Sequence, residues 1–317
     1  MSSSAATILD SVREGGRIAL VRLRSLGDCV LTTPAIALLH QWRPDLQIAV
    51  VVENRFRAIF EGLPAVSAIL PPEYRAIAAW HPRVCVNLHG GTRSMLLTLA
   101  SAARIRAGFA HHRGASLVYN VRIPRAQEII GDERPVHTAE HLASAMFHLG
   151  VPVSDPPRAC LFAKPLRAER PYAVVHPAAA AAYKTWPAER FLAAARHIAA
   201  VHRLEPVFIG GAADDLTPFR EFRSVVGAPI GEVKNLLAGA SLFIGNDSGP
   251  AHMAAAFGVP VVVLFGRLEH SVTWAPWRAR AARTLASGNG IAAIPVAAAL
   301  RALDEVAAEA GVSAPRD

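Results

Sequence analysis

The sequence predicts an α/β protein with two Rossmann-like parallel-sheet domains that face a central cleft. Short apolar runs alternate with helical stretches in two successive series, and a proline-rich stretch separates the series. The 317 residues also suffice for two domains, since about 150 residues per domain is usual. Near-continuous apolar runs such as IALV and IAVVV are typical of strands covered on both faces, as in parallel sheets.

The first domain is expected over residues 1–155. Three apolar runs are each followed by a helical stretch, which indicates βαβ units. The expected strands are residues 17–22, 47–52 and 84–88, and the expected helices are residues 31–42, 55–61 and 92–103. A last helix over residues 137–149 is expected to end at Gly150.

The second domain is expected over residues 172–317, after a proline-rich linker at residues 156–171 where periodicity is lost. Its expected strands are residues 173–176, 206–209, 241–245 and 260–265, and its expected helices include residues 187–202 and 295–310. The last helix, within residues 295–311, is expected to pack back on the N-terminal domain.

Composition excludes several classes of protein. Hydrophobic residues make up 52% and charged residues 18% of the chain, which predicts a globular protein. The net charge of +8 comes mostly from arginines and is attributed to codon bias, and because no nucleic-acid-binding motif is found, no nucleic-acid partner is expected. Cys29, Cys85 and Cys160 form no C-x-x-C pair, so no metal site is expected. Without a signal peptide or a spanning apolar segment, the protein is expected to be cytoplasmic.

The first candidate site is the turn LRSLGD after the first strand, which contains Asp28. A carboxylate at a strand end can take the proton of an attacking hydroxyl as a general base. An Asp before a helix is also a common N-cap. The sequence leaves both interpretations open.

The second candidate is the loop HPAAAAAYKTWP, which contains Lys184, one of only three lysines. A helix is expected to open at Pro187, in the favoured first-turn position. A cation beside a helix N-terminus suits a diphosphate leaving group. A solvated loop lysine is the alternative.

The third candidate is the segment GNDSGPAH between a strand and an alanine-rich helix, with Asp247, Ser248, Gly249 and His252. Backbone N–H groups and a carboxylate at a helix start suit a phosphate or a sugar hydroxyl, although each residue alone could be a cap or a packed side chain. The segment GGAADD supplies Asp214 and Asp215, carboxylates that could reach a ribose. The absence of G-x-G-x-x-G, P-loop, G-x-S-x-G and H-E-x-x-H motifs argues against dehydrogenase, ATPase, hydrolase and zinc-protease activities.

Together the segments RIALVRLRSLGDCVLTTPAI, HPAAAAAYKTWPAERF and LFIGNDSGPAHMAAAFGVPVVVLFG resemble glycosyltransferase family 9, the ADP-heptose:lipopolysaccharide heptosyltransferases. The resemblance runs in order through both halves. It implies a GT-B fold, a metal-independent inverting transfer without a cofactor, and an anionic glycolipid acceptor at the cytosolic face of the inner membrane, where peripheral contact is expected. The donor it implies is a nucleotide-sugar, ADP-heptose.

The resemblance also implies roles for the candidate residues. Asp28 would be the base and Lys184 would steady the departing diphosphate. Asp247 would hold donor-sugar hydroxyls, and Ser248, Gly249 and His252 would line the phosphate and sugar site. Asp214 or Asp215 would approach the ribose. Ser25, Arg93 and Ser94 would belong to the acceptor side.

The sequence departs from the family pattern in the second motif, where Ala178–Ala182 stand in place of the usual Gly and Ser or Thr. An all-alanine loop supplies only backbone donors, which leaves open a catalytically silent sugar-nucleotide-binding protein as an alternative to transfer. A sugar-nucleotide epimerase with the same two-domain GT-B architecture is a further alternative.

Overall fold

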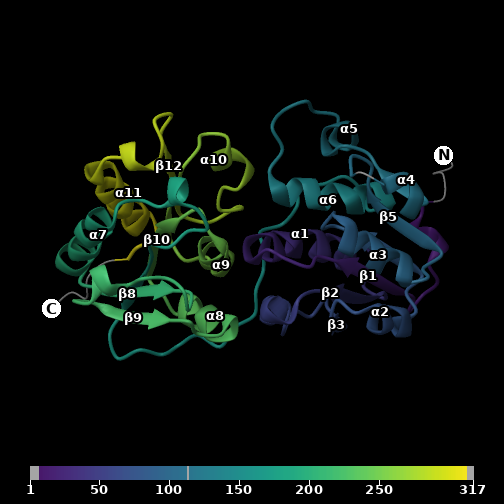
Figure 1. The fold of residues 1–317 in the computed structure, drawn as a ribbon, viewed down its shortest axis with the longest axis horizontal. Coiled ribbons are helices and arrows are strands. Elements are labelled where there is room, and N and C mark those ends of the chain that lie inside the picture. The colour runs from purple at the N-terminus through teal and green to yellow at the C-terminus, as the bar shows by residue number, and fades with distance from the viewer. Residues whose placement is uncertain (1–6, 113, 313–317) are drawn as a thin grey trace. The chain divides into compact units, whose positions relative to one another are not determined.

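The computed structural model describes residues 7–112 and 114–312. The chain divides into two compact units, Met1–Phe162 and Ala163–Asp317, and the boundary falls inside the predicted linker of residues 156–171 (Figure 1). Each unit is built from a six-stranded sheet with helices on it. None of the helices in the described ranges has both the length and the apolar character that crossing a bilayer requires.

The first unit is a parallel sheet in the order β3-β2-β1-β4-β5-β6. Its strands are β1 (Arg17–Val21), β2 (Gln47–Val51), β3 (Ala68–Leu70), β4 (Val84–Asn87), β5 (Ile105–Phe109) and β6 (Val121–Ile123). Its α-helices are α1 (Leu26–Trp42), α2 (Tyr74–Trp80), α3 (Thr92–Ala100), α4 (Ala115–Val118), α5 (Ala126–Ile130) and α6 (Thr138–Leu149). The 3-10 helices η1 (Leu9–Ser11) and η2 (Asn54–Ile59) complete it.

The second unit is also parallel, in the order β12-β11-β10-β7-β8-β9. Its strands are β7 (Tyr172–His176), β8 (Glu205–Gly210), β9 (Arg223–Val226), β10 (Leu242–Asn246), β11 (Val261–Phe265) and β12 (Ala282–Ala286). Its α-helices are α7 (Ala188–Val201), α8 (Ile230–Ala238), α9 (Gly249–Phe257), α10 (His270–Thr273) and α11 (Val296–Glu309). The 3-10 helices are η3 (Ala182–Lys184), η4 (Thr217–Phe219) and η5 (Ile291–Ala293).

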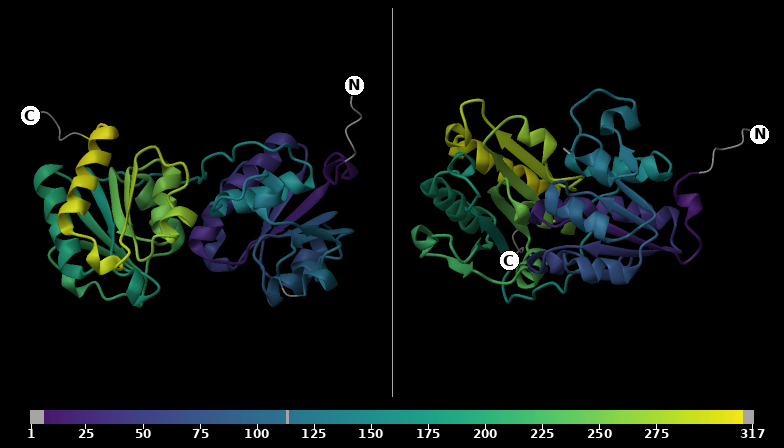
Figure 2. Two further views of the ribbon diagram at one scale, coloured as in Figure 1. Left: turned by 90° about the horizontal axis from the view of Figure 1, so that it is seen from above. Right: turned by 45° about the vertical axis from the view of Figure 1, so that its right-hand side comes forward.

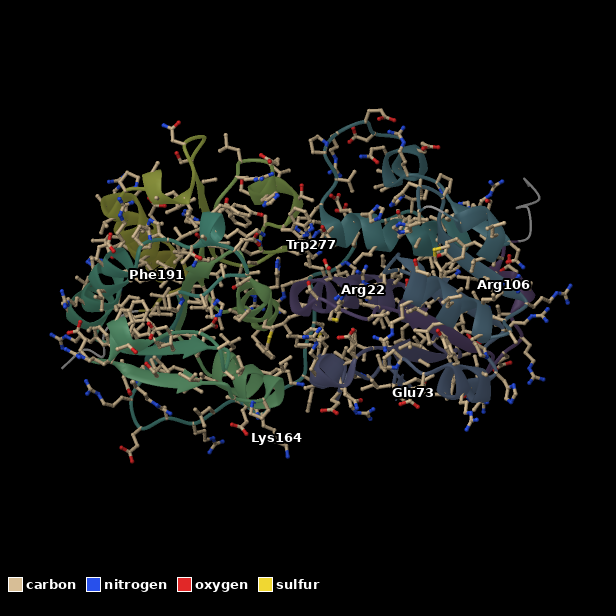
Figure 3. The ribbon with its side chains drawn as sticks, in the orientation of Figure 1. Arg22, Glu73, Arg106, Lys164, Phe191 and Trp277 are labelled. Carbon is tan, nitrogen blue, oxygen red and sulfur yellow. The ribbon has the colours of Figure 1, made fainter. Side chains whose placement is uncertain are left out.

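The central strands of both units are buried, apart from the exposed first residue of β1, Arg17, as their apolar runs predict. In the second unit a core of aromatic and aliphatic side chains, including Trp186 and Phe191, lies between the sheet and helices α7 and α11 (Figure 3). In the first unit α1 packs against α6 and α2 packs against α3. Each unit therefore has its own core, which fixes the strand ends that carry the candidate residues.

Three expectations about individual elements are corrected. Helix α1 begins at Leu26, not residue 31, because Ser25 already serves as its N-cap. Residues 54–59 form a short 3-10 helix. Pro187 is the N-cap of α7, which begins at Ala188.

The C-terminal helix α11 packs on α7, β11 and β12 of its own unit (Figure 2). Its expected packing on the N-terminal domain stays a prediction. Its buried face, with Ala299, Leu303 and Val306, belongs to the core of the second unit.

Candidate functional site

In each sheet, successive strands of the chain are added first on one side and then on the other. This change of direction falls at the equivalent place in both sheets. In the first unit the reversal lies between β1 and β4, and in the second unit it lies between β7 and β10. Doubly wound sheets bind ligands outside the carboxyl ends of the strands at such a switch point. The residues predicted for the site follow those strands: Ser25 and Asp28 follow β1, Arg93 and Ser94 follow β4, Lys184 follows β7, and Asp247, Ser248 and Gly249 follow β10.

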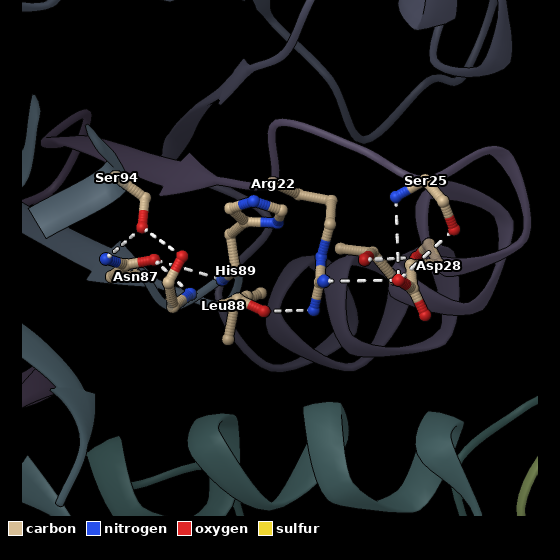
Figure 4. Close-up of polar contacts among 9 residues, drawn as sticks. Arg22, Ser25, Asp28, Asn87, Leu88, His89 and Ser94 are labelled. Carbon is tan, nitrogen blue, oxygen red and sulfur yellow. Dashed lines mark hydrogen bonds and ion pairs between the residues drawn. The ribbon is translucent and has the colours of Figure 1, made fainter. Parts of the chain in front are cut away.

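In the first unit, Asp28 belongs to the first turn of α1 and Ser25 caps that helix (Figure 4). Asp28 Oδ2 accepts a hydrogen bond from the Ser25 backbone N–H at 3.5 Å and from the Ser25 hydroxyl at 3.3 Å. This is the reciprocal arrangement of a capping box. Asp28 is therefore the third helical residue and not the cap, and its side chain keeps 31% of its surface exposed. The carboxylate is held in place and still open on one side.

Arg22 connects the loops after β1 and β4. Its side chain is buried, its Nη2 donates to Leu88 O, and its Nη1 lies 3.8 Å from Asp28 Oδ2 (Figure 4). Burial lowers the pKa of Arg22 from its ordinary value, and the Asp28 carboxylate acts in the opposite direction. A buried guanidinium thus faces one side of Asp28 and fixes the position of both loops.

Ser94 has a structural role in the loop GGTRS. Its side chain is buried, its hydroxyl donates to Gly90 O (2.6 Å) and Gly91 O (2.8 Å), and it accepts from Asn87 Nδ2 (3.0 Å) (Figure 4). Its neighbour Arg93 differs, because its side chain is 58% exposed and its Nη1 lies 3.5 Å from Glu53 Oε1. Of the three predicted acceptor-side residues, Ser25 and Arg93 are exposed to solvent, whereas Ser94 is buried.

Histidines surround the same strand ends. Burial and the nearby Arg22 and Arg24 lower the pKa of His89 to about 4. Burial, helped by His111, Arg22 and His112, lowers the pKa of His141 to about 4 as well. His141 stacks on Phe109 with ring centroids 4.0 Å apart, and His111 and His112 lie 4.3 Å apart. The lowered pKa values keep His89 and His141 neutral at pH 7, so the positive charge near Asp28 comes from Arg22 and Arg24, which suit an anionic ligand.

In the second unit, Lys184 and Asp247 meet although they are far apart in the sequence. Lys184 Nζ donates to Asp247 Oδ2 at 2.6 Å, and the side chains are 21% and 7% exposed. Lys184 lies in η3, four residues before α7 begins. The backbone at Gly266 packs directly against the backbone at Tyr183, and a Cβ atom on Gly266 would lie only 2.3 Å from Tyr183 O. This close packing holds the loop that carries Lys184. Lys184 and Asp247, which are predicted to contact the phosphate and the sugar, thus form one ion pair at the switch point.

Ser248 and His176 form a second polar pair beside this one. Ser248 Oγ lies 2.9 Å from His176 Nδ1, and burial lowers the pKa of His176 to about 4. Ser248 is the N-cap of α9, and Gly249 is its first residue. His252 is buried one turn further along. The start of α9 therefore combines a hydroxyl with a helix N-terminus, which favours a negatively charged group.

Asp214 and Asp215 follow β8 and border a cavity of about 260 Å³. Asp214 Oδ2 accepts from the Gly211 N–H at 2.7 Å, and Asp215 Oδ1 accepts from the Thr217 N–H at 2.9 Å. The cavity is lined by Pro177, Ala178, Ala179, Thr185, Trp186, Ala188, Asp214, Asp215, Leu216, Pro218 and Phe219. The alanine loop and the two carboxylates therefore border the same small cavity.

Sequence reasoning missed Arg22, His89, His176 and Asn246. Asn246 Nδ2 donates to Pro177 O (2.7 Å) and its Oδ1 accepts from the Trp186 N–H (3.2 Å), so it ties the Lys184 loop to β10. Arg22, His176 and Asn246 each lie inside or directly beside a motif already identified. A polar residue at the end of an otherwise apolar strand is the signal that could have found them.

Comparisons with known proteins agree with this arrangement. The model of "Glycosyltransferase family 9 (heptosyltransferase)" matches residues 83–292. Lipopolysaccharide heptosyltransferase 3 of Escherichia coli is 26% identical over 298 residues, which cover 80% of this chain and 84% of that protein. The lipopolysaccharide core heptosyltransferase OpsX of Haemophilus influenzae is 20% identical over 280 residues, which cover 78% of each.

Solved structures show the same fold. The E. coli ADP-heptose lipopolysaccharide heptosyltransferase II superposes with a TM-score of 0.75 at 19% identity, covering 92% of this chain and 98% of the other. The E. coli heptosyltransferase WaaC with ADP gives 0.75 at 20% identity, covering 92% and 99%. The predicted α/β class with two Rossmann-like domains of the GT-B type is confirmed. Because the family model spans more than half of the chain, the protein belongs to glycosyltransferase family 9 and is a glycosyltransferase.

Proposed function

We propose that the protein transfers heptose from ADP-heptose to a lipopolysaccharide-core acceptor, with inversion at the anomeric carbon and without a metal ion. The relatives named above are heptosyltransferases of lipopolysaccharide, which supports this donor and acceptor. The observation that carries the proposal is that a half-exposed carboxylate in one unit and a lysine-aspartate pair in the other lie at equivalent switch points.

The proposed reaction is a single displacement. The acceptor hydroxyl attacks the anomeric carbon of the donor, the bond from that carbon to the diphosphate oxygen breaks, and the electron pair leaves with ADP. Asp28 takes the hydroxyl proton, since Ser25 and Arg22 hold its carboxylate with one side open. Attack from the face opposite the leaving group inverts the configuration.

The leaving diphosphate is stabilised by positive groups of the second unit. Lys184 supplies a full charge, and the start of α9 at Ser248 and Gly249 supplies backbone N–H groups and the helix dipole. Asp247 orients the Lys184 amine at 2.6 Å and would also receive donor-sugar hydroxyls. A lysine that fills the role of a divalent cation supports metal-independent transfer.

The adenosine end of the donor is assigned to the cavity beside the alanine loop. Asp214 and Asp215 are suited to ribose hydroxyls, and Trp186 with Phe219 gives the cavity an apolar side. The edge of the first unit carries the cations Arg22 and Arg24 beside neutral histidines, and these cations suit phosphate or carboxylate groups of an anionic glycolipid. Such an acceptor would bring the protein, otherwise cytoplasmic, to the inner face of the inner membrane.

Incubation with ADP-heptose and a Kdo-lipid acceptor tests this proposal by measuring ADP release and the mass of the product. We expect release that requires the acceptor and that falls strongly in Asp28→Ala. Nucleotide binding without ADP release, the same in both proteins, would indicate a silent binding protein. Turnover of the donor without any acceptor would indicate an epimerase.

A further inference from the structure

A cluster of two histidines and one aspartate joins the ends of two helices in the second unit. His197 lies near the end of α7, His202 is the C-cap of the same helix, and Asp304 lies on α11. His197 Nε2 is 2.7 Å and His202 Nε2 is 2.9 Å from the same oxygen, Asp304 Oδ1. Helices α7 and α11 lie side by side in this unit (Figure 1). Within residues 7–112 and 114–312, this is the only group of three metal-ligating side chains that converge.

The arrangement has the features of a metal site. The three ligand atoms lie within 4.8 Å of one another, and the two imidazole rings are tilted by 74° with centroids 5.7 Å apart. In a tetrahedral site with ligand bonds of about 2.0–2.2 Å, neighbouring ligand atoms are roughly 3.5 Å apart. A small outward movement of the histidine rings would therefore admit an ion. Two imidazole nitrogens and one carboxylate oxygen are a donor set that suits Zn²⁺.

Exposure at the cluster differs between the histidines and the aspartate. The side chains of His197 and His202 are 19% and 9% exposed, so packing limits the positions of both rings. Asp304 is 46% exposed, which leaves the outer side open to water as a further ligand. The protein thus fixes the two nitrogens, and entry from solvent is unobstructed on the carboxylate side.

The cluster lies away from the candidate site of the same unit. In a βαβ unit the helix runs back along the sheet, so the end of α7 lies near the amino ends of the strands, and β8 begins only three residues after His202. Lys184 and Asp247 follow the carboxyl ends. An ion here would connect α7 to α11 and would not contact the reacting groups.

We propose that His197, His202 and Asp304 are the protein ligands of a structural site that binds one divalent transition-metal ion, Zn²⁺. The ion replaces the protons shared between the imidazoles and the carboxylate, and it binds the folded second unit more tightly than the unfolded chain. Binding therefore stabilises the protein by mass action.

The test uses the full chain without an affinity tag, treated with chelator and then titrated with ZnCl₂ by calorimetry. We expect one Zn²⁺ per chain and a rise of about 5 °C in the melting temperature at a hundredfold excess over the dissociation constant. Asp304→Asn, which keeps the shape of the side chain, and His197→Gln, which keeps a polar side chain of similar length, should each weaken binding by about 10- to 100-fold.

Glu305→Gln is the matched control, because it removes the adjacent carboxylate of α11, whose partner is Arg283 and not the histidines. Replacement by Co²⁺ gives a second readout, since an N/O site lacks the thiolate absorption that binding at the exposed Cys160 would produce. No Zn²⁺ binding, binding that Asp304→Asn and Glu305→Gln weaken equally, or a thiolate spectrum would each overturn the proposal. Circular dichroism of the variants establishes that they are folded.

Discussion

The two units share one sheet order but present different polar groups at the switch point. In the first unit, Asp28 is 31% exposed and is held by Ser25 and by the more distant Arg22. In the second unit, Asp247 is only 7% exposed and pairs directly with Lys184 at 2.6 Å. The first carboxylate is open to a substrate proton, whereas the second is already engaged. Under the proposed function, proton transfer would belong to the first unit and orientation of a cation to the second.

The histidines near the switch point also differ between the two units. The first unit gathers His89, His111, His112 and His141 near Arg22, and burial together with the nearby positive charges lowers the pKa of His89, His112 and His141, which favours their neutral forms. In the second unit His176 is buried and bonded to Ser248. The same strand order can therefore carry two kinds of binding surface, because the residues that follow the strands differ between the two units.

The largest effect is expected from Asp28→Asn. The amide keeps an oxygen for the capping contacts with Ser25 but cannot take a proton, so kcat should fall by about 10²- to 10⁴-fold. ADP affinity should stay unchanged, because nucleotide binding is assigned to the second unit. Steady-state kinetics and calorimetry measure the two quantities.

The control for this change is Glu140→Gln, at the equivalent position in the capping box of α6. If Asp28 only caps a helix, both variants should keep their activity; their stabilities need not match, because Glu140 also pairs with Arg134. A normal kcat in the Asp28→Asn protein would show that Asp28 is not the general base, and would contradict the placing of proton transfer in the first unit.

A smaller effect is expected from Lys184→Met. Loss of the charge beside the leaving diphosphate should lower kcat by about 10²- to 10³-fold. It also leaves the Asp247 carboxylate without its cation, so donor affinity should fall as well. Kinetics and ADP calorimetry check both parts, with Lys164→Met, an exposed lysine of the same unit, as the control. A change in neither parameter would show that the ion pair only stabilises the loop.

Much of the fold could be predicted from the sequence, because its central strands are apolar enough to be recognised alone. Strands β1, β4, β7, β10 and β11 were all identified within a residue or two. Strands β3, β5, β6, β9 and β12 were missed. A short edge strand such as Arg223–Val226 is mostly exposed and has no apolar run, and in the inner strand β5 the apolar residues are interrupted by Arg106 and Gly108. The start of α1 was misplaced because Ser25 and Asp28 both have the composition of a cap.

The candidate site was only partly predictable. The motifs located Asp28, Lys184 and Asp247, yet the pairing of Lys184 with Asp247 spans 63 residues and depends on the strand order β10-β7. The burial of Ser94 and Arg22 likewise depends on β1 and β4 being neighbours. Local patterns identify which residues are polar at strand ends, and the topology decides which of them meet.

A pH-dependent loss of stability is expected in the first unit. The pKa of His141 is about 4 in the folded protein and 6.5 ordinarily, so the unfolded chain binds its proton first as the pH falls. Neutral His141 therefore favours folding above pH 6.5, and this stability is lost between pH 6.5 and 4. One pKa unit corresponds to about 1.4 kcal/mol, so the loss is up to ~3 kcal/mol.

His141→Gln should reduce this loss, which urea unfolding at pH 8 and pH 5 measures. His81→Asn is the control, because His81 is an exposed C-cap in the left-handed conformation that Asn also adopts. An equal loss of stability in wild type and His141→Gln would assign the acid sensitivity to other groups, such as His176 in the second unit.

The smallest effect concerns the alanine loop of the second unit. Ala179 lines the cavity beside Asp214, and its methyl group offers no hydrogen bond to a nucleotide. In Ala179→Ser a hydroxyl at this place should add about 0.5–1.5 kcal/mol to donor binding, so the dissociation constant for ADP should fall by roughly 3- to 10-fold. Ala180→Ser, on the exposed part of the loop, should leave it unchanged. Equal affinities in all three proteins would show that the nucleotide does not reach this loop, and the adenosine end would then have to lie elsewhere in the second unit.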